Sequence, residues 1–261
     1  MSRGEQHGNR SRGRRDRNRR SIWARPGPGE RRPAWTREQI VAVALAIADA
    51  EGFEAVSMRR IAGELGAGTM TIYHYVQTKD ELVALIGDAI MGELVVPEDE
   101  LPDGWREGMT AIARRTLAVF DRHPWILRHM GDGDEENPGP NGMRHFEQTL
   151  AVMARAGIDA ESQLELAALV DEYVFGHAMH SREPNPFGQP DSEQERELLE
   201  YVERQLTTGE FPHLEALAGD DVRGTFRRLS ATASDERRFE RGLKILLDGI
   251  ELEIERRRTR H

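Results

Sequence analysis

Apolar residues recur every three or four positions along most of this chain, which is the spacing of amphipathic helices. The last such segment is typical, with its apolar residues at Phe239, Leu243, Leu246, Ile250 and Ile254. No segment shows the strict alternation of apolar and polar residues expected of a half-buried strand. The pattern therefore predicts an all-α fold.

Four short helices are marked clearly between residues 36 and 93. Thr36-Arg-Glu-Gln39 and Thr78-Lys-Asp-Glu81 both have the form of a capping box, in which side chains satisfy the free amides of a first helical turn. Gly52 suits a helix end, Ser57 suits an N-cap, and 66–68 carries two turn-forming glycines. The predicted helices cover 37–51, 58–65, 69–76 and 78–93.

The third of these helices has two different faces. Ile72 and Val76 are four residues apart and should point into a small core, which leaves an outward face made of Thr69, Met70, Tyr73 and His74. An ordinary solvated face would carry more Glu, Lys and Arg. Hydroxyl and aromatic groups instead suit base edges, thymine methyls and phosphates. The sequence therefore predicts a helix-turn-helix whose second helix enters the DNA major groove.

Charge is distributed unevenly. The whole chain has a net charge of −10, yet residues 1–32 hold eleven arginines against three acidic residues, a local net of +8. Residues 1–34 have too few apolar groups to fold alone, so we expect a disordered basic arm. Two interpretations stay open, an arm that binds DNA phosphates and a solvated tail.

Several motifs together resemble one family, the tetracycline-repressor-like (TetR) transcriptional regulators. They are Ala-Leu-Ala-Ile-Ala-Asp-Ala-Glu-Gly-Phe, Ser-Met-Arg-Arg-Ile-Ala-Gly-Glu-Leu-Gly, Thr-Ile-Tyr-His-Tyr-Val and Lys-Asp-Glu-Leu, in the family's order over about 50 positions. Tyr-His-Tyr-Val-Gln-Thr-Lys is similar to the tetracycline-repressor branch. The resemblance implies a bacterial, homodimeric transcription factor, most often a repressor, that a small-molecule effector releases from a double-stranded DNA operator.

The resemblance also implies roles for individual residues. Major-groove contacts would come from Thr69, Met70, Thr71 and His74, and phosphate contacts from Arg59, Tyr73, Tyr75 and Lys79. Met70 departs from the smaller residue often found at its position, so the operator sequence does not transfer from the family.

The resemblance divides the rest of the chain by function. Residues 35–80 would form the DNA-binding domain and residues 81–261 a ligand-binding and dimerisation domain, whose late helices pair in a four-helix bundle. An effector pocket would be lined by aromatic and apolar residues, for which the candidates are Phe120, Trp125, Phe146, Leu150, Met153, Tyr173 and His177. The alternative for each is a place in the ordinary core.

Two other function classes are weighed against this one. His177 and His180, with Asp171 and Glu172 nearby, would suit a metal-dependent helical-bundle enzyme, but the spacing lacks a required third ligand. The negative net charge of the chain outside the basic arm would suit a protein-interaction module that has lost DNA binding. We expect no enzyme, no metal and no cofactor. The chain has no cysteine, and its longest apolar run is nine residues, so we expect a cytoplasmic protein that does not enter a membrane.

Overall fold

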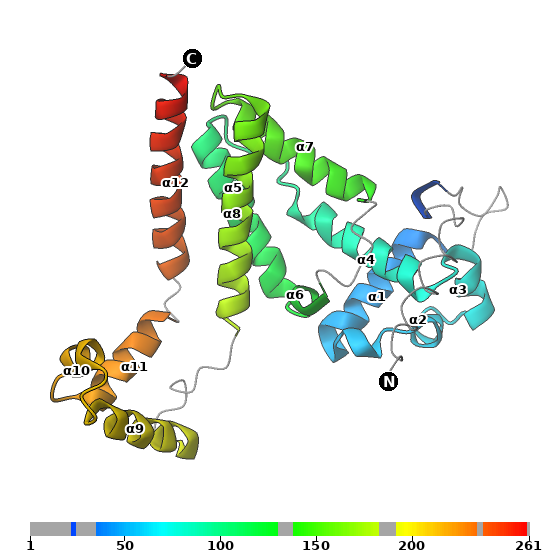
Figure 1. The fold of residues 1–261 in the computed structure, drawn as a ribbon. Helices are drawn as coiled ribbons and strands as arrows, with labels where there is room; N and C mark the ends of the chain where they lie inside the picture. The colour runs from blue at the N-terminus through cyan, green and yellow to red at the C-terminus, as the bar shows by residue number, and fades with distance from the viewer. Residues whose placement is uncertain (1–21, 25–34, 130–137, 183–191, 234–236, 260–261) are drawn as a thin grey trace, which may run out of the picture. The chain divides into compact units, whose positions relative to one another are not determined.

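The computed structural model describes residues 22–24, 35–129, 138–182, 192–233 and 237–259, and these are all-helical, with no strand (Figure 1). The predicted basic arm lies outside the described residues except for a single helical turn. In chain order the elements are η1 (Ile22–Ala24), α1 (Arg37–Glu51), η2 (Phe53–Ala55), α2 (Met58–Glu64), α3 (Thr69–Tyr75), α4 (Lys79–Leu94), α5 (Trp105–Arg122), α6 (Ile126–His129), α7 (Pro140–Ala154), α8 (Ala160–His180), α9 (Glu193–Leu206), α10 (Pro212–Ala218), α11 (Val222–Ala233) and α12 (Arg237–Arg258).

The capping signals in the sequence are confirmed at the start of α1. The Thr36 hydroxyl accepts from the Gln39 amide at 3.2 Å, and the Gln39 side chain accepts from the Thr36 amide at 2.9 Å. At α4 the Thr78 hydroxyl accepts from the Glu81 amide, but the Glu81 carboxylate turns to the amide of Gln77 instead of the cap. Local sequence therefore sets where these helices begin.

Helices α10 and α11 were missed in the sequence. The seven residues of α10 make two turns and bury only Ala218, so no helical period emerges from them. Pro212 at the first turn and Gly219 after the last are the signals that mark this helix, because proline suits a helix start and glycine a helix end.

The chain divides into two compact units. The first comprises residues 1–95 and 122–146, and the second comprises 96–121 and 147–261. The boundary predicted at residue 80 falls inside the first unit, because α4 packs on α1 with Leu82, Ile86 and Ile90 buried. The short segment that follows α5 also belongs to the first unit, which sequence patterns did not indicate.

A buried carboxylate joins α4 to α7 within the first unit. Asp88 accepts hydrogen bonds from the backbone amides of Asn141 and Gly142, at 2.9 and 3.1 Å. These amides lie in the first turn of α7, where no helical partner exists for them. Pro140 has no amide to satisfy. A side chain of α4 therefore serves as the cap of α7.

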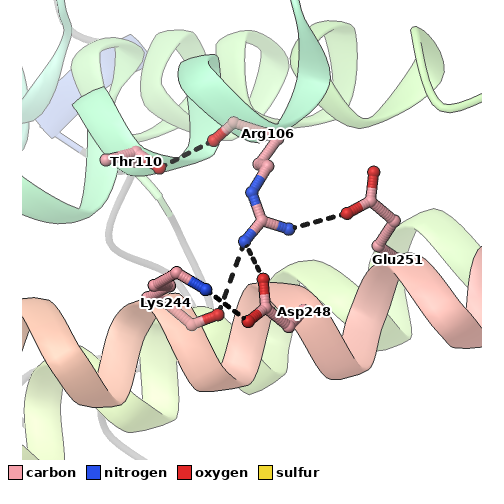
Figure 2. A network of polar contacts seen from close by, with 5 residues as sticks. All are labelled: Arg106, Thr110, Lys244, Asp248 and Glu251. Carbon is pink, nitrogen blue, oxygen red and sulfur yellow. Dashed lines mark hydrogen bonds and ion pairs between the residues drawn. The ribbon is translucent and has the colours of Figure 1, made fainter.

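In the second unit α12 is held against both α5 and α8. Figure 2 shows the guanidinium of Arg106, on α5, directed at Asp248 and Glu251 on α12, with 3.0 Å to the Glu251 carboxylate. Lys244 donates to Asp248 at 2.8 Å. On α8, the Tyr173 hydroxyl donates to the carbonyl of Phe239 at 2.9 Å, and the two rings stack with centroids 5.6 Å apart.

Gly242 permits this close approach of α8 to α12. A Cβ placed there would lie 2.2 Å from the Tyr173 hydroxyl oxygen. We expect Gly242→Ala to lower the free energy of unfolding by about 1–3 kcal/mol, because overpacking outweighs the better helix propensity of alanine. Chemical denaturation measures this change.

The matched control is Gly87→Ala, at a helical glycine of α4 with no atom within 4 Å of the added Cβ. It should leave stability unchanged or raise it by up to about 1 kcal/mol. In a protein that already carries Tyr173→Leu, Gly242→Ala should no longer lower the free energy of unfolding, because the ring that the new methyl group would meet is gone. Equal effects of the two alanines would refute the role given to Gly242.

Candidate functional site

A glycine turn sets the angle between α2 and α3. Gly66 has a φ of 61°, in the left-handed region that glycine adopts without strain. The Ala67 amide donates to the Ala62 carbonyl at 2.9 Å and the Gly66 amide to Gly63 at 3.2 Å, which is the paired bonding of a Schellman motif. This turn ends α2 and directs the chain into α3.

Helix α3 presents the outward face that its spacing predicts. Ile72 and Val76 are fully buried, at 0% exposure, and hold the helix from behind. Met70 is 80% exposed and Tyr73 42% exposed, and Thr71 and His74 are exposed beside them. Exposed apolar and aromatic side chains that lie together on one face, as Met70 and Tyr73 do, mark a site of interaction more often than single ones. The face is therefore suited to contact with another molecule.

Tyr75 differs from the expectation that it contacts phosphate. Its side chain is buried, at 5% exposure, because it lies three residues after Ile72 and so shares the inward face of α3. The backbone of Tyr75 instead accepts a hydrogen bond from the Arg37 guanidinium at 3.3 Å. Tyr75 thus belongs to the core that supports the helix.

Positive groups beside α3 are of two kinds. Arg60 is engaged with acidic neighbours, since its guanidinium pairs with Glu51 at 2.7 Å and with Glu64. Arg59 is exposed. Lys79 is exposed at the start of α4, with its ammonium 5.9 Å from the centre of the Phe53 ring. Arg59 and Lys79 are therefore two exposed cations near the face of α3.

Two candidate effector residues meet beside a small hollow in the second unit. Tyr173 and His177, on α8, line a space of about 240 Å³ together with His180 and Arg238. The His177 and Phe239 rings lie 5.1 Å apart. Burial, with the nearby Arg238 charge, lowers the pKa of the His177 imidazole, and burial raises the pKa of the Tyr173 hydroxyl. Both shifts favour the uncharged form of the side chain.

The other candidates lie elsewhere. Phe120 is buried edge-on to Phe175, Met153 is fully buried, and Leu150 is half-buried. Phe146 is largely exposed on α7. Trp125 is buried in the first unit, where it stacks on Phe53 at 5.2 Å. A larger hollow of about 400 Å³ between α5 and α12 has mostly charged walls, including Arg106, Arg114 and Glu240.

Within the described parts of the chain, no group of three or more His, Asp or Glu side chains is placed to hold a metal ion. Among the same residues, none of the helices is long and apolar enough to cross a membrane.

Comparison with known proteins decides the family. Residues 40–86 match the family model of bacterial regulatory proteins of the tetR family, and residues 96–254 match that of the tetracyclin repressor-like C-terminal domain. The chain belongs to the TetR family. It is therefore a DNA-binding transcriptional regulator, and α2 and α3 are its helix-turn-helix.

Individual relatives agree with this assignment. The chain is 35% identical to the HTH-type transcriptional repressor DrrR1 of Streptomyces coeruleorubidus, over 90% of this chain and 83% of that protein. Its fold is similar to that of ActR from Streptomyces coelicolor in complex with actinorhodin, with a TM-score of 0.63, 32% identity, and coverage of 83% of this chain and 95% of ActR. A second ActR structure, in complex with (S)-DNPA, gives a TM-score of 0.62 at 30% identity, covering 83% and 97%.

Proposed function

We propose that this TetR-family chain is a transcriptional repressor that binds a DNA operator as a homodimer and leaves it when a small-molecule effector binds. DNA binding is supported above all by the exposed face of α3, which carries no Asp, Glu, Lys or Arg and lies opposite the buried residues Ile72 and Val76. DrrR1, a repressor, supports the direction of regulation. A regulator of this kind acts on the chromosome, so we place it in the bacterial cytoplasm and assign it no enzymatic activity.

The proposed DNA contacts come from residues on the outward side of α3 and its neighbours, all exposed except Thr69, which is half-buried. Thr69, Met70, Thr71 and His74 would meet base edges in the major groove, where hydroxyl, thioether and imidazole groups read hydrogen-bonding atoms and thymine methyls. Phosphates would be met by Arg59, Tyr73 and Lys79, which are exposed on α2, α3 and α4. We leave Tyr75 out of this set because its ring is buried.

The homodimer is supported by the outer faces of α8 and α12. Apolar side chains are exposed on both helices, namely Leu164, Leu169 and Met179 on α8 and Ile245 and Leu252 on α12. Water-exposed apolar residues on two adjacent helices favour association with a second copy. Two copies are also needed to place two α3 helices in successive major grooves.

The effector proposal rests on the aromatic group formed by Tyr173, His177 and Phe239. Aromatic walls beside both a guanidinium, that of Arg238, and a carboxylate, that of Glu172, suit a flat ligand that carries hydroxyl groups. Since the ActR structures contain actinorhodin and (S)-DNPA, these two compounds are the first effectors to test.

Selection of bound duplexes from a random-sequence library by the full-length protein tests the function. We expect enrichment of a sequence with two-fold symmetry, whose half-sites lie about 10 base pairs apart or a multiple of it. An effector should then weaken binding about 5- to 150-fold, the range of ordinary coupling free energies. Failure to enrich any sequence would contradict DNA binding, and enrichment without symmetry would contradict the dimer.

A further inference from the structure

An aromatic and charged cluster in the first unit extends from the start of α4 to the segment after α5. Lys79 lies over the Phe53 ring, and Phe53 stacks on Trp125 with an interplanar angle of 15°. The Trp125 indole N–H donates to Asp49 at 2.8 Å. His123 lies 2.7 Å from the same Asp49 oxygen through Nδ1. We call these five residues the Lys79 cluster.

The cluster joins parts of the chain that are distant in sequence. Asp49 and Phe53 lie at and just after the end of α1, whereas His123 and Trp125 follow the last residue of α5 directly. The second nitrogen of His123 lies 3.3 Å from Glu93, near the end of α4, and Glu93 pairs with Arg122 at 2.5 Å. One short segment is therefore fastened to α1 and α4 at once.

Burial makes this arrangement rigid. Trp125 and Phe53 are both buried, and only 4% of the His123 side chain is exposed. The Asp49 carboxylate itself is 33% exposed, and its charge strengthens the hydrogen bond that it accepts from the buried Trp125 indole, which fixes the orientation of the ring. The plane of the Phe53 ring is thus set by Trp125, and the ring face that meets the Lys79 ammonium is set with it.

We propose that Trp125 and His123 are positioning residues for operator binding, which hold Lys79 where it meets a DNA phosphate. They act through Phe53 and Asp49 and do not touch DNA themselves. An ammonium drawn to an aromatic face keeps its charge and its outward donors. With its stem ordered in advance, Lys79 loses less conformational entropy when it binds phosphate. This inference rests on the proposed function, because it assigns a cause to one of the proposed phosphate contacts.

The salt dependence of operator binding separates positioning from mere stability. The logarithm of the binding constant falls linearly with the logarithm of salt concentration, and each lost phosphate contact makes this slope shallower by about 0.9. A dimer carries two copies of Lys79, so Lys79→Ala should make the slope shallower by about 2. We expect Trp125→Leu to produce a similar reduction and to weaken binding roughly tenfold, on a duplex first selected by the wild-type protein. In the double variant Trp125→Leu/Lys79→Ala, binding should be no weaker than with Lys79→Ala alone.

Leu199→Ala is the control for lost core packing, because Leu199 is fully buried in α9, away from the Lys79 cluster in the chain. It should lower stability and leave the slope unchanged. If Trp125→Leu is unfolded by circular dichroism, His123→Gln is measured against the same expectations. An unchanged slope, or losses that add in the double variant, would overturn the inference. A wild-type protein that selects no duplex would instead contradict the proposed function.

Discussion

Tyr73→Ala is expected to weaken operator binding about 100-fold while leaving the melting temperature unchanged. The expectation combines a loss of about 1.5 kcal/mol for each hydrogen bond to a charged phosphate with the two copies of α3 in a dimer. Stability should hold because Tyr73 is 42% exposed and the buried residues behind it remain in place. Fluorescence anisotropy with the selected duplex measures the affinity, and thermal denaturation followed by circular dichroism measures the fold.

Tyr201→Ala is a suitable control for this substitution. Tyr201 is also exposed, at 53%, but it lies on α9 in the second unit. Removing it takes away the same aromatic group from a surface with no proposed DNA contact. Equal losses of affinity in the two variants would remove Tyr73 from the interface.

Arg227→Met is expected to destabilise the helices α9 to α11 by ~3 kcal/mol. Glu195 on α9 is 1% exposed, and Arg227 on α11 meets its carboxylate with two donors, at 2.8 and 2.7 Å. Removal of the guanidinium takes two charge-assisted hydrogen bonds from a buried carboxylate, which is costly in a low-dielectric interior. Hydrogen exchange of the α9 amides should report the loss as faster local opening.

Two further variants identify the cause of that loss. Arg223→Met breaks the exposed pair of Arg223 with Glu203, whose groups are 3.5 Å apart, and should cost under about 1 kcal/mol. The double variant Glu195→Met/Arg227→Met removes both charges of the pair and should regain most of the stability, because apolar side chains can replace a buried ion pair. If Arg227→Met lowers the free energy of unfolding no more than Arg223→Met does, the pair of Arg227 with the buried carboxylate does not stabilise these helices.

The sequence alone determined the helices α1 to α4 and the family. Capping at Thr36 and Thr78, the turn at Gly66 and the burial of Ile72 and Val76 depend on residues within a few positions of one another. Hydrogen bonds inside one helical turn and the period of 3.6 residues are local properties. For the same reason the exposed side of α3 could be predicted before any tertiary contact was known.

Only the tertiary structure decided which side chains meet across the chain. Trp125, a candidate for the effector pocket, lies against Phe53 and Asp49, and the indole bonds to a residue 76 positions away. Gly242 is required by a tyrosine on another helix, Tyr173. Apolar and aromatic residues carry no signal of their partner, because burial is favourable against any well-packed surface. The local pattern therefore specified the DNA-reading helix, whereas the packing of distant segments decided what supports it.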